Sequence, residues 1–193
     1  MSSFKKYVKK DDTVLEIGAS VYERTKDLAP YCKKIIGVEL FPERIPKKKE
    51  SGKIKYIRGD WQKLTKILPK NSIDIAVNNQ VLEHVHNDVK ALDELYTVLK
   101  PGGIVLMCTP NRTRLLQWIQ DKIKGERKFP WAEHVREYTK EDVYVLVKKI
   151  KFKKVHIFAH TFGIHAGPLY AYFERVPAFF EKKANFLEIH LVK

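Results

Sequence analysis

The sequence predicts an α/β protein built on a doubly wound, mostly parallel sheet with helices on both faces. Short apolar runs rich in Val, Ile and Leu alternate with amphipathic stretches almost from the first residue, which is the pattern of β-α-β units. The runs are nearly continuous, as strands covered on both faces require. The 193 residues, 44% of them hydrophobic, are enough for one compact core. We therefore expect a single domain over residues 1–193.

The apolar runs predict seven strands. Five lie in the first part of the chain, at Thr13 to Gly18, Lys34 to Leu40, Ile54 to Gly59, Ile73 to Asn78 and Ile104 to Thr109. Two more follow later, at Lys154 to His160 and Asn185 to Val192. The alternation with amphipathic stretches predicts that the first five are parallel.

Two helices have clear periodicity. The first lies between the fourth and fifth strands, with apolar residues at helical spacing at Val89, Leu92, Leu95, Tyr96 and Leu99. Pro101-Gly102-Gly103 is expected to stop it. The second is expected to begin at Thr139, whose hydroxyl can cap the first turn together with Asp142. Its buried stripe would be Val143, Leu146, Val147 and Ile150.

Two less regular stretches, about residues 110–138 and 161–183, follow the fifth and sixth strands. In an open α/β sheet the ligand crevice lies at the carboxyl ends of the strands, so both insertions are expected on the substrate side. The second is rich in aromatic residues, which would suit an aromatic or lipid-like acceptor. We expect most of them to pack instead, in a helix that buries Leu169, Phe173 and Val176.

The chain is strongly basic, with 37 Lys and Arg against 23 Asp and Glu and a net charge of +14. This charge could attract RNA or an acidic membrane surface at low salt. The lysines are spread along the whole chain, however, and a lysine-rich solvated surface is also common in heat-adapted proteins. Charge alone therefore leaves the partner open.

Cysteine use and hydropathy predict a cytoplasmic protein. Cys32 and Cys108 are the only cysteines, and they have neither a disulfide nor a metal-ligand spacing. The first ten residues carry lysines where a signal peptide needs an apolar stretch, and no later segment approaches the apolar length of a membrane span. We expect no export and no membrane-spanning segment.

A nucleoside site is expected where the first three strands end. The first strand runs into a turn at Gly18, but Ser20 and Glu23 stand where a dinucleotide fingerprint needs its other two glycines, which disfavours a nicotinamide or flavin site. Glu39 ends the second strand and could accept hydrogen bonds from both ribose hydroxyls of an adenosine. Asp60-Trp61 follows the third strand and offers a carboxylate for the adenine amino group and an aromatic wall.

The order of these segments resembles the class I S-adenosylmethionine-dependent methyltransferases, most closely the branch called methyltransferase type 11. The most specific stretch is Asp74 to Val85, followed by the helix, Leu99 to Gly103 and Thr109-Pro110-Asn111. The resemblance covers about residues 13–160 and extends loosely to a seventh, antiparallel strand near Phe186 to Val192. It implies a Rossmann-like sheet and S-adenosyl-L-methionine as the cofactor.

The resemblance also assigns cofactor-binding positions. It implies that Gly18 and its neighbours hold the methionine part, that Glu39 binds the ribose, and that Asp60 and Trp61 bind the adenine. The full expected set is Glu16, Gly18, Ala19, Ser20, Glu39, Leu40, Asp60, Trp61, Asn78 and Asn79, with the two asparagines near the methionine ammonium. The sequence departs from the family at Ser20 and Tyr22, where glycine is usual, and this departure places the affinity for the cofactor in question.

Two histidines are candidates for the base that removes a proton from a hydroxyl or amine acceptor: His84 after the fourth strand, and His134 before the second helix. Each could instead be structural. No pair of histidines has the spacing of a helix-borne metal motif, so no metal is predicted.

The favoured function is methyl transfer to a small-molecule, lipid or quinone-type acceptor. RNA methylation is the first alternative because of the charge, with Trp118, Trp131 or Tyr170 as stacking surfaces for bases. Asn78-Asn79-Gln80-Val81 lacks the proline-rich pattern of enzymes that methylate exocyclic amines of nucleic acids, which argues against it. The second alternative is a non-catalytic binding protein that retains the fold. The oligomeric state is not predicted.

Overall fold

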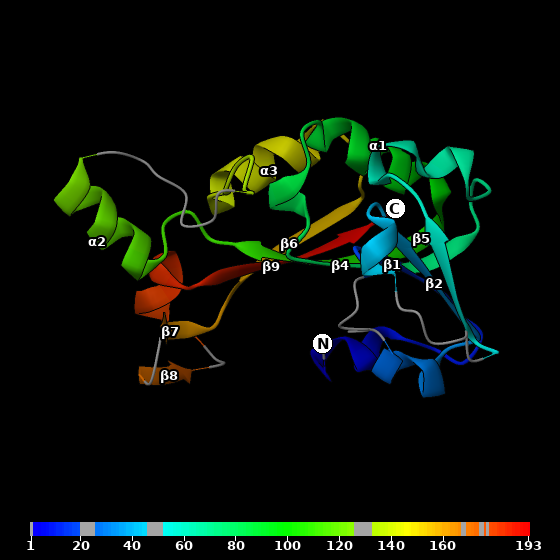
Figure 1. Ribbon diagram of the computed structural model, residues 1–193, viewed down its shortest axis with the longest axis horizontal. Coiled ribbons are helices and arrows are strands. Elements are labelled where there is room, and N and C mark those ends of the chain that lie inside the picture. The colour runs from blue at the N-terminus through cyan, green and yellow to red at the C-terminus, as the bar shows by residue number, and fades with distance from the viewer. Residues whose placement is uncertain are drawn as a thin grey trace.

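A seven-stranded sheet with the order β3-β2-β1-β4-β5-β9-β6 forms the centre of the molecule (Figure 1). The computed structural model describes residues 2–19, 26–45, 52–125, 133–166, 169–173, 176 and 178–193. The strands of the sheet are β1 Thr13–Ile17, β2 Lys34–Glu39, β3 Ile54–Arg58, β4 Ile73–Asn79, β5 Leu99–Pro110, β6 Lys154–His160 and β9 Phe186–Val192. All seven strands predicted from the sequence are therefore present. β5 begins five residues earlier than predicted, and the other strand ends differ by at most one residue.

The first five strands are parallel, and β9 is antiparallel to both of its neighbours, β5 and β6. This confirms the predicted Rossmann-like sheet with an antiparallel last strand. After β1 the chain winds outward through β2 to β3, and it then crosses back to place β4 on the other side of β1. Ligand crevices form at such a reversal of strand order, outside the carboxyl ends of the strands.

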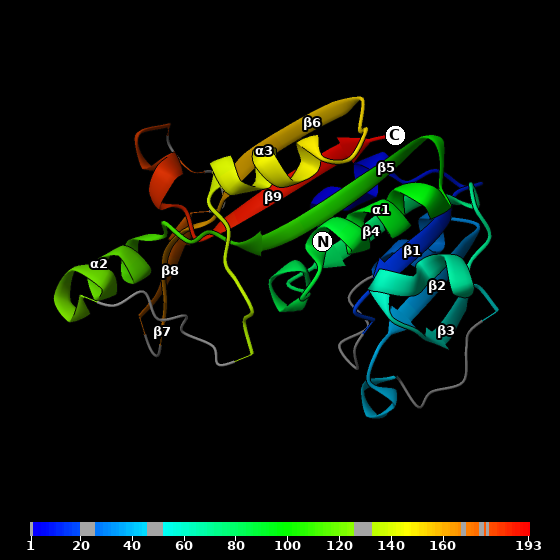
Figure 2. The ribbon, with the colours of Figure 1, turned by 90° about the horizontal axis from the view of Figure 1, so that it is seen from above.

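Helices cover both faces of the sheet. One face carries α1 Asp88–Val98, α3 Lys140–Lys148 and the 3₁₀ segment η4 Trp61–Lys66 (Figure 2). The 3₁₀ segments η1 Ser2–Tyr7 and η2 Lys26–Tyr31 lie below the sheet in Figure 1. Each layer buries its own apolar cluster, and Leu92 and Leu95 of α1 and Phe4 of η1 are almost fully buried.

Side-chain caps define where the two predicted helices begin. Asn87 Oδ1 accepts a hydrogen bond from Lys90 N at 3.0 Å, and Thr139 and Asp142 form the expected capping box. The first of these helices ends earlier than predicted. α1 ends at Val98, and the backbone is already extended at Leu99. Pro101-Gly102-Gly103 lies inside β5, next to the irregular register between β4 and β5.

The second insertion differs from the prediction. Residues Phe162–Ala166 and Leu169–Phe173 form an antiparallel two-stranded ribbon, β7 and β8, so the helix expected through Leu169, Phe173 and Val176 is wrong. Strand-forming aromatic and branched residues dominate this stretch, and that preference outweighs the apparent helical spacing. A 3₁₀ segment, η6 Ala178–Lys183, then leads into β9.

The first insertion contains α2 Leu115–Lys124, which projects from the end of the sheet at the left of Figure 1. Two short 3₁₀ segments, η3 Pro42–Arg44 and η5 Leu82–His84, follow β2 and β4. None of the helices in the described ranges has the length and apolar character needed to cross a membrane.

Candidate functional site

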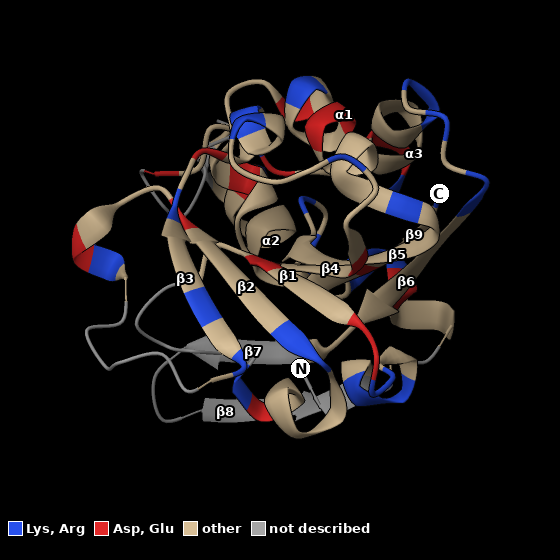
Figure 3. Cartoon of the chain, turned by 90° about the vertical axis from the view of Figure 1, so that its right-hand side faces the viewer, with Lys and Arg blue, Asp and Glu red and all other residues tan. Residues whose placement is uncertain are grey.

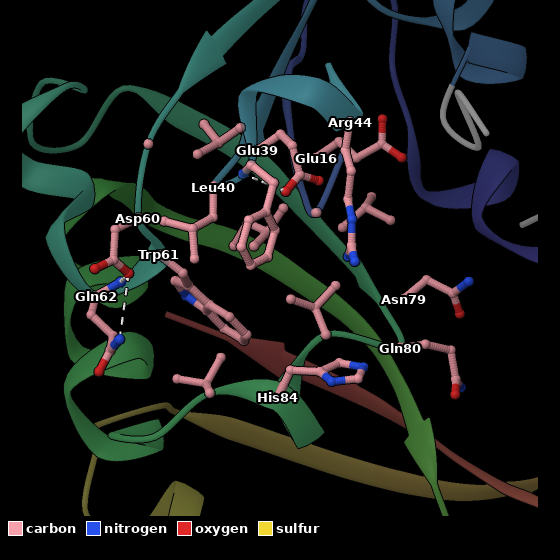
Figure 4. Close-up of a pocket in the computed structure, with 18 of the residues that line it drawn as sticks. Glu16, Glu39, Leu40, Arg44, Asp60, Trp61, Gln62, Asn79, Gln80 and His84 are labelled. Atoms are coloured by element: carbon pink, nitrogen blue, oxygen red, sulfur yellow. Dashed lines mark hydrogen bonds between the residues drawn. The ribbon is translucent and has the colours of Figure 1, made fainter. Parts of the chain in front are cut away.

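A cavity of about 690 Å³ opens at the carboxyl ends of β1, β2, β3 and β4 (Figure 4). This volume is within the range of about 300–1,000 Å³ that is usual for small-molecule sites. Of the expected cofactor-binding residues, its lining includes Glu16, Gly18, Glu39, Leu40, Asp60, Trp61 and Asn79. Residues far apart in the sequence thus meet at the crevice predicted from the strand order.

Gly18 shapes the floor of the cavity where β1 ends. Its φ of 72° lies in the left-handed region, and a Cβ at this position would collide with the side chain of Val81. The N–H groups of Gly18 and Ala19 both donate to Val38 O, at 2.9 and 3.2 Å, which holds the turn against β2. These two donors are therefore occupied, and the absence of a side chain at Gly18 leaves room for Val81, which lines the cavity.

Glu39 is presented by the last position of β2 and is almost fully buried. Its Oε1 accepts from Phe41 N at 3.0 Å, whereas Oε2 accepts no hydrogen bond from the described part of the chain. The carboxylate is thus fixed in orientation and keeps one oxygen for a ligand donor. Arg44 of η3 extends toward the same cavity from beside Phe41 (Figure 4).

Asp60 and Trp61 form the side wall at the start of η4. Asp60 Oδ1 accepts from Gln62 N at 2.8 Å and caps this segment, so the short helix fixes both residues. Trp61 is buried, and its Nε1 has no hydrogen-bond partner among the described residues. A buried N–H without a partner costs free energy, which a bound polar ligand would recover.

Two of the remaining expected residues, Ala19 and Asn78, do not line the cavity. Asn79 lines the cavity, but Asn78 projects to the α1 side of the sheet, where both of its side-chain polar atoms are buried without a partner in the described ranges. The side chain of Ala19 is fully buried and does not line the cavity, and Ser20 and Tyr22 lie outside the described residues. The cofactor roles of these residues stay predictions.

At the other end of the cavity, the two candidate bases come into contact. His84 lines the cavity at the end of η5, and the His134 ring packs edge-on against it with centroids 4.9 Å apart. His84 Nδ1 lies 3.0 Å from Glu133 O, and His134 Nδ1 lies 2.9 Å from Glu137 Oε1. Because a carbonyl oxygen can only accept, His84 must donate from Nδ1, which leaves Nε2 as the proton acceptor in the neutral ring.

A buried ion pair supports His134 from behind. The Glu137 side chain is fully buried and receives two hydrogen bonds from Arg114, at 2.6 Å from Nη1 and 3.0 Å from Nη2. Because the Glu137 carboxylate also accepts from the ring of His134, His134 donates from Nδ1 and its tautomer is fixed. Burial lowers the pKa of His134 despite the attraction of Glu137, which favours the neutral ring.

Glu83 completes this cluster. Burial raises its pKa to about 7, and Thr109 Oγ1 donates to its Oε2 at 3.1 Å. Ligand atoms of Glu83, His84 and His134 lie within 4.8 Å of one another, so these three residues could hold a metal ion. The sequence spacing predicted no metal because His134 reaches the pair only through the fold.

Sequence reasoning missed several residues of the site. Arg44, Gln62 and Glu133 line the cavity, and Arg114 and Glu137 hold His134. Gln62 could have been predicted, because it directly follows Asp60 and Trp61 and ligand crevices lie at the carboxyl ends of the strands. Arg114 and Glu137 gave none, because their pairing joins two positions of an irregular insertion.

Comparisons with known proteins agree with this geometry. A family model described as "Methyltransferase domain" matches residues 15–107, which contain Gly18, Glu39, Asp60, Trp61 and His84. Residues 15–107 are thus similar to the class I S-adenosylmethionine-dependent methyltransferases. The matching family model and the relatives imply S-adenosylmethionine as the cofactor.

The curated relatives match only part of their own length. An uncharacterized methyltransferase of Schizosaccharomyces pombe is 37% identical over 114 residues, which are 52% of this chain and 40% of that protein. The chain spans less than half the length of the curated relatives that it matches.

Two solved structures share the fold. An S-adenosylmethionine-dependent methyltransferase from Archaeoglobus fulgidus superposes with a TM-score of 0.70 at 19% identity, covering 100% of this chain and 92% of that one. The phosphoethanolamine N-methyltransferase 2 of Haemonchus contortus, in complex with phosphomonomethylethanolamine and S-adenosylhomocysteine, gives a TM-score of 0.64 at 18% identity over 81% of this chain and 37% of that one. At these identities the likeness establishes the fold alone.

Proposed function

We propose that the protein transfers a methyl group from S-adenosylmethionine to a small-molecule, lipid or quinone-type acceptor. The observation that carries this proposal is one continuous cavity with two different ends. One end has the polar groups for a nucleoside, at Glu39, Asp60 and Trp61, and the other has His84 beside a buried ion-paired cluster. Methyl transfer requires a bound donor and an acceptor aligned next to it.

The nucleoside end fits the cofactor in shape and chemistry. Glu39 offers Oε2 to the ribose hydroxyls while Phe41 N holds its other oxygen. Trp61 provides an apolar wall for the adenine ring, and Gly18 lies in the lining where the methionine part would bind. The S-adenosylmethionine sulfonium supplies the activated methyl group when bound, so the protein mainly positions the reactants.

His84 acts as the proton acceptor for a hydroxyl or amine acceptor in this proposal. Glu133 O fixes its tautomer, and Nε2 carries the free lone pair. His134 is a second candidate base. In the described geometry it packs behind His84, and Glu137 and Arg114 hold it in place.

Calorimetric titration with S-adenosylmethionine and S-adenosylhomocysteine tests the nucleoside end. We expect saturable binding that Glu39→Ala weakens about tenfold or more, because the variant loses hydrogen bonds to a charged group. Glu43→Ala is the matched control, since Glu43 is an exposed acid of the adjacent η3 and does not line the cavity. Unchanged affinity in Glu39→Ala would refute the placement, and no binding by the unmodified protein would favour a non-catalytic role.

A further inference from the structure

The helix α2 has its amphipathic character reversed relative to the protein body. Its polar residues Gln117 and Asp121 face inward: Gln117 is only 2% exposed, and Arg112 Nη2 lies 2.7 Å from Asp121 Oδ2. Gln117 Nε2 donates to Asp121 Oδ1 at 3.1 Å, and Arg114 Nη2 donates to Gln117 Oε1 at 3.3 Å. The polar face of the helix is therefore bonded to the two arginines that precede it, Arg112 and Arg114, whereas surface helices normally pack by their apolar face.

The opposite face of α2 presents large apolar side chains to solvent. Ile123 is 77% exposed, and Leu116, Trp118 and Ile119 are exposed beside it. η6 extends this surface, because Lys182 O accepts a hydrogen bond from Thr113 Oγ1 at 2.6 Å just before α2 begins. Phe179 of η6 is 89% exposed, and Phe180 is exposed next to it. We call these six residues, Leu116, Trp118, Ile119, Ile123, Phe179 and Phe180, the α2–η6 patch.

Several lysines lie beside the patch, on α2 and η6. Lys183 Nζ lies 4.4 Å from the centroid of the Trp118 ring, and burial together with the charge of Lys122 lowers the pKa of Lys183. Lys182 adds a third cation, whereas η6 carries one acid, Glu181. Positive charge is also distributed over other elements of the molecule, as Figure 3 shows, and it totals +14.

We propose that the α2–η6 patch docks on an anionic membrane surface. Exposed Trp, Phe and Ile next to lysines are the composition of helices that lie in the headgroup region, with the rings in the acyl boundary and the lysines on acidic lipids. A second copy of the chain fits less well, because self-association would bring the two sets of lysines together. The surface lies on the two insertions that flank the predicted substrate side.

This location connects the surface with the acceptor. α2 and the buried cluster share Arg114, which bonds both Gln117 and Glu137. Docking through α2 would thus hold the His84 end of the cavity near the lipid phase. If the proposed methyltransferase function holds, this favours an acceptor taken from a membrane over a water-soluble one.

Cosedimentation with vesicles tests the docking, without cofactor or acceptor. The probes are vesicles of phosphatidylcholine with phosphatidylglycerol, and vesicles of phosphatidylcholine alone. We expect binding to the anionic vesicles that weakens at high salt. The double variant Ile123→Ser with Phe179→Ser should bind at least about tenfold more weakly, because both side chains lose their burial in the lipid.

The matched control is Tyr144→Ser with Val145→Ser, two exposed apolar residues of α3 away from the patch. This control should bind vesicles like the unmodified protein. Equal binding to neutral and anionic vesicles, or unchanged binding by the Ile123→Ser/Phe179→Ser variant, would overturn the proposal. A dimer in light scattering that this variant converts to a monomer would also overturn it, in favour of a second copy.

The vesicle experiment and the cofactor titration test the two proposals independently. Vesicle binding without S-adenosylhomocysteine binding would leave the docking surface intact and remove the proposed function. The converse result would retain the methyltransferase and remove the membrane surface.

Discussion

His84 and His134 are adjacent in space, but the structure gives them different surroundings. His84 contacts the cavity and is oriented by a backbone carbonyl, whereas His134 is oriented by a buried carboxylate. A backbone carbonyl fixes a tautomer without adding charge, which suits a base that must release its proton after each turnover. The negative charge of Glu137 instead raises the pKa of His134, but burial outweighs this effect and favours the neutral ring.

His84→Gln should lower kcat about 100-fold or more for a hydroxyl or amine acceptor, because general-base catalysis contributes about 10²–10⁴. Cofactor affinity by calorimetry should not change, since the nucleoside end is intact. The exposed His156 of β6 gives the control variant His156→Gln. A variant that retains full kcat would exclude His84 as the base, and loss of activity on adding EDTA would point to a metal held by Glu83, His84 and His134.

Glu83 makes stability depend on pH. Burial raises its pKa from 4.5 to about 7, so the folded state binds the proton more tightly than the unfolded state does. The stabilisation is fully present below pH 4.5 and is lost as the pH rises through about 7. Relative to Glu83→Gln, the unmodified protein should lose about 2 kcal/mol of unfolding free energy between about pH 5 and about pH 8.

Urea denaturation at both pH values measures this difference. Glu141→Gln is the control, because Glu141 is an exposed acid in the first turn of α3. It should follow the unmodified protein at each pH. A parallel pH dependence in Glu83→Gln would show that Glu83 does not titrate in this range.

Site residues were predictable from the sequence where one strand end carries them. Glu39, Asp60 and Trp61 follow buried apolar runs, and the carboxyl-end rule places all three at one crevice. Asn78 and Asn79 show the limit of this rule, since consecutive residues of a strand point to opposite faces and only Asn79 reaches the cavity. The contact between His84 and His134 joins two loops and has no local pattern that could reveal it.

Elements were predictable where hydrophobic periodicity and tertiary burial agree. The continuous apolar runs located the seven strands, and the Thr139 and Asp142 pair located the start of α3. The β7–β8 ribbon was not foreseen, because its aromatic residues also fit a helical spacing. α2 shows a related difficulty: the sequence pattern identifies an amphipathic helix, but it does not show that the polar face packs inward.

The polar face of α2 packs inward because two arginines next to the helix can pair with carboxylates. Arg112 and Arg114 lie just before the helix and supply cations for Asp121 and Glu137. Partly buried pairs of this kind are strong only when the geometry is good, and both arginines approach within 2.7 Å of their carboxylates. The apolar face is therefore left outside, where only a further surface can bury it.

At the scale of the whole molecule, β9 joins the edge strand β6 to the rest of the sheet. It pairs with β5 on one side and β6 on the other, each over seven residues. Its Leu187, Ile189 and Leu191 are buried in the main apolar cluster. Because β9 comes last among the strands, its docking closes contacts of large sequence separation, which are entropically costly to form.

This arrangement predicts a gradient in amide hydrogen exchange. Amides of β9 should exchange only through global unfolding, because both edges of the strand are paired and its side chains lie in the core. Amides of β3, an edge strand with incompletely buried side chains, should exchange through smaller openings. Exchange measured by mass spectrometry across a denaturant series would separate the two, since global openings depend on denaturant more steeply than local ones. Equal protection of β3 and β9 would mean that the sheet opens as one unit, and faster exchange in β9 would mean that the antiparallel strand can detach while the parallel strands stay folded.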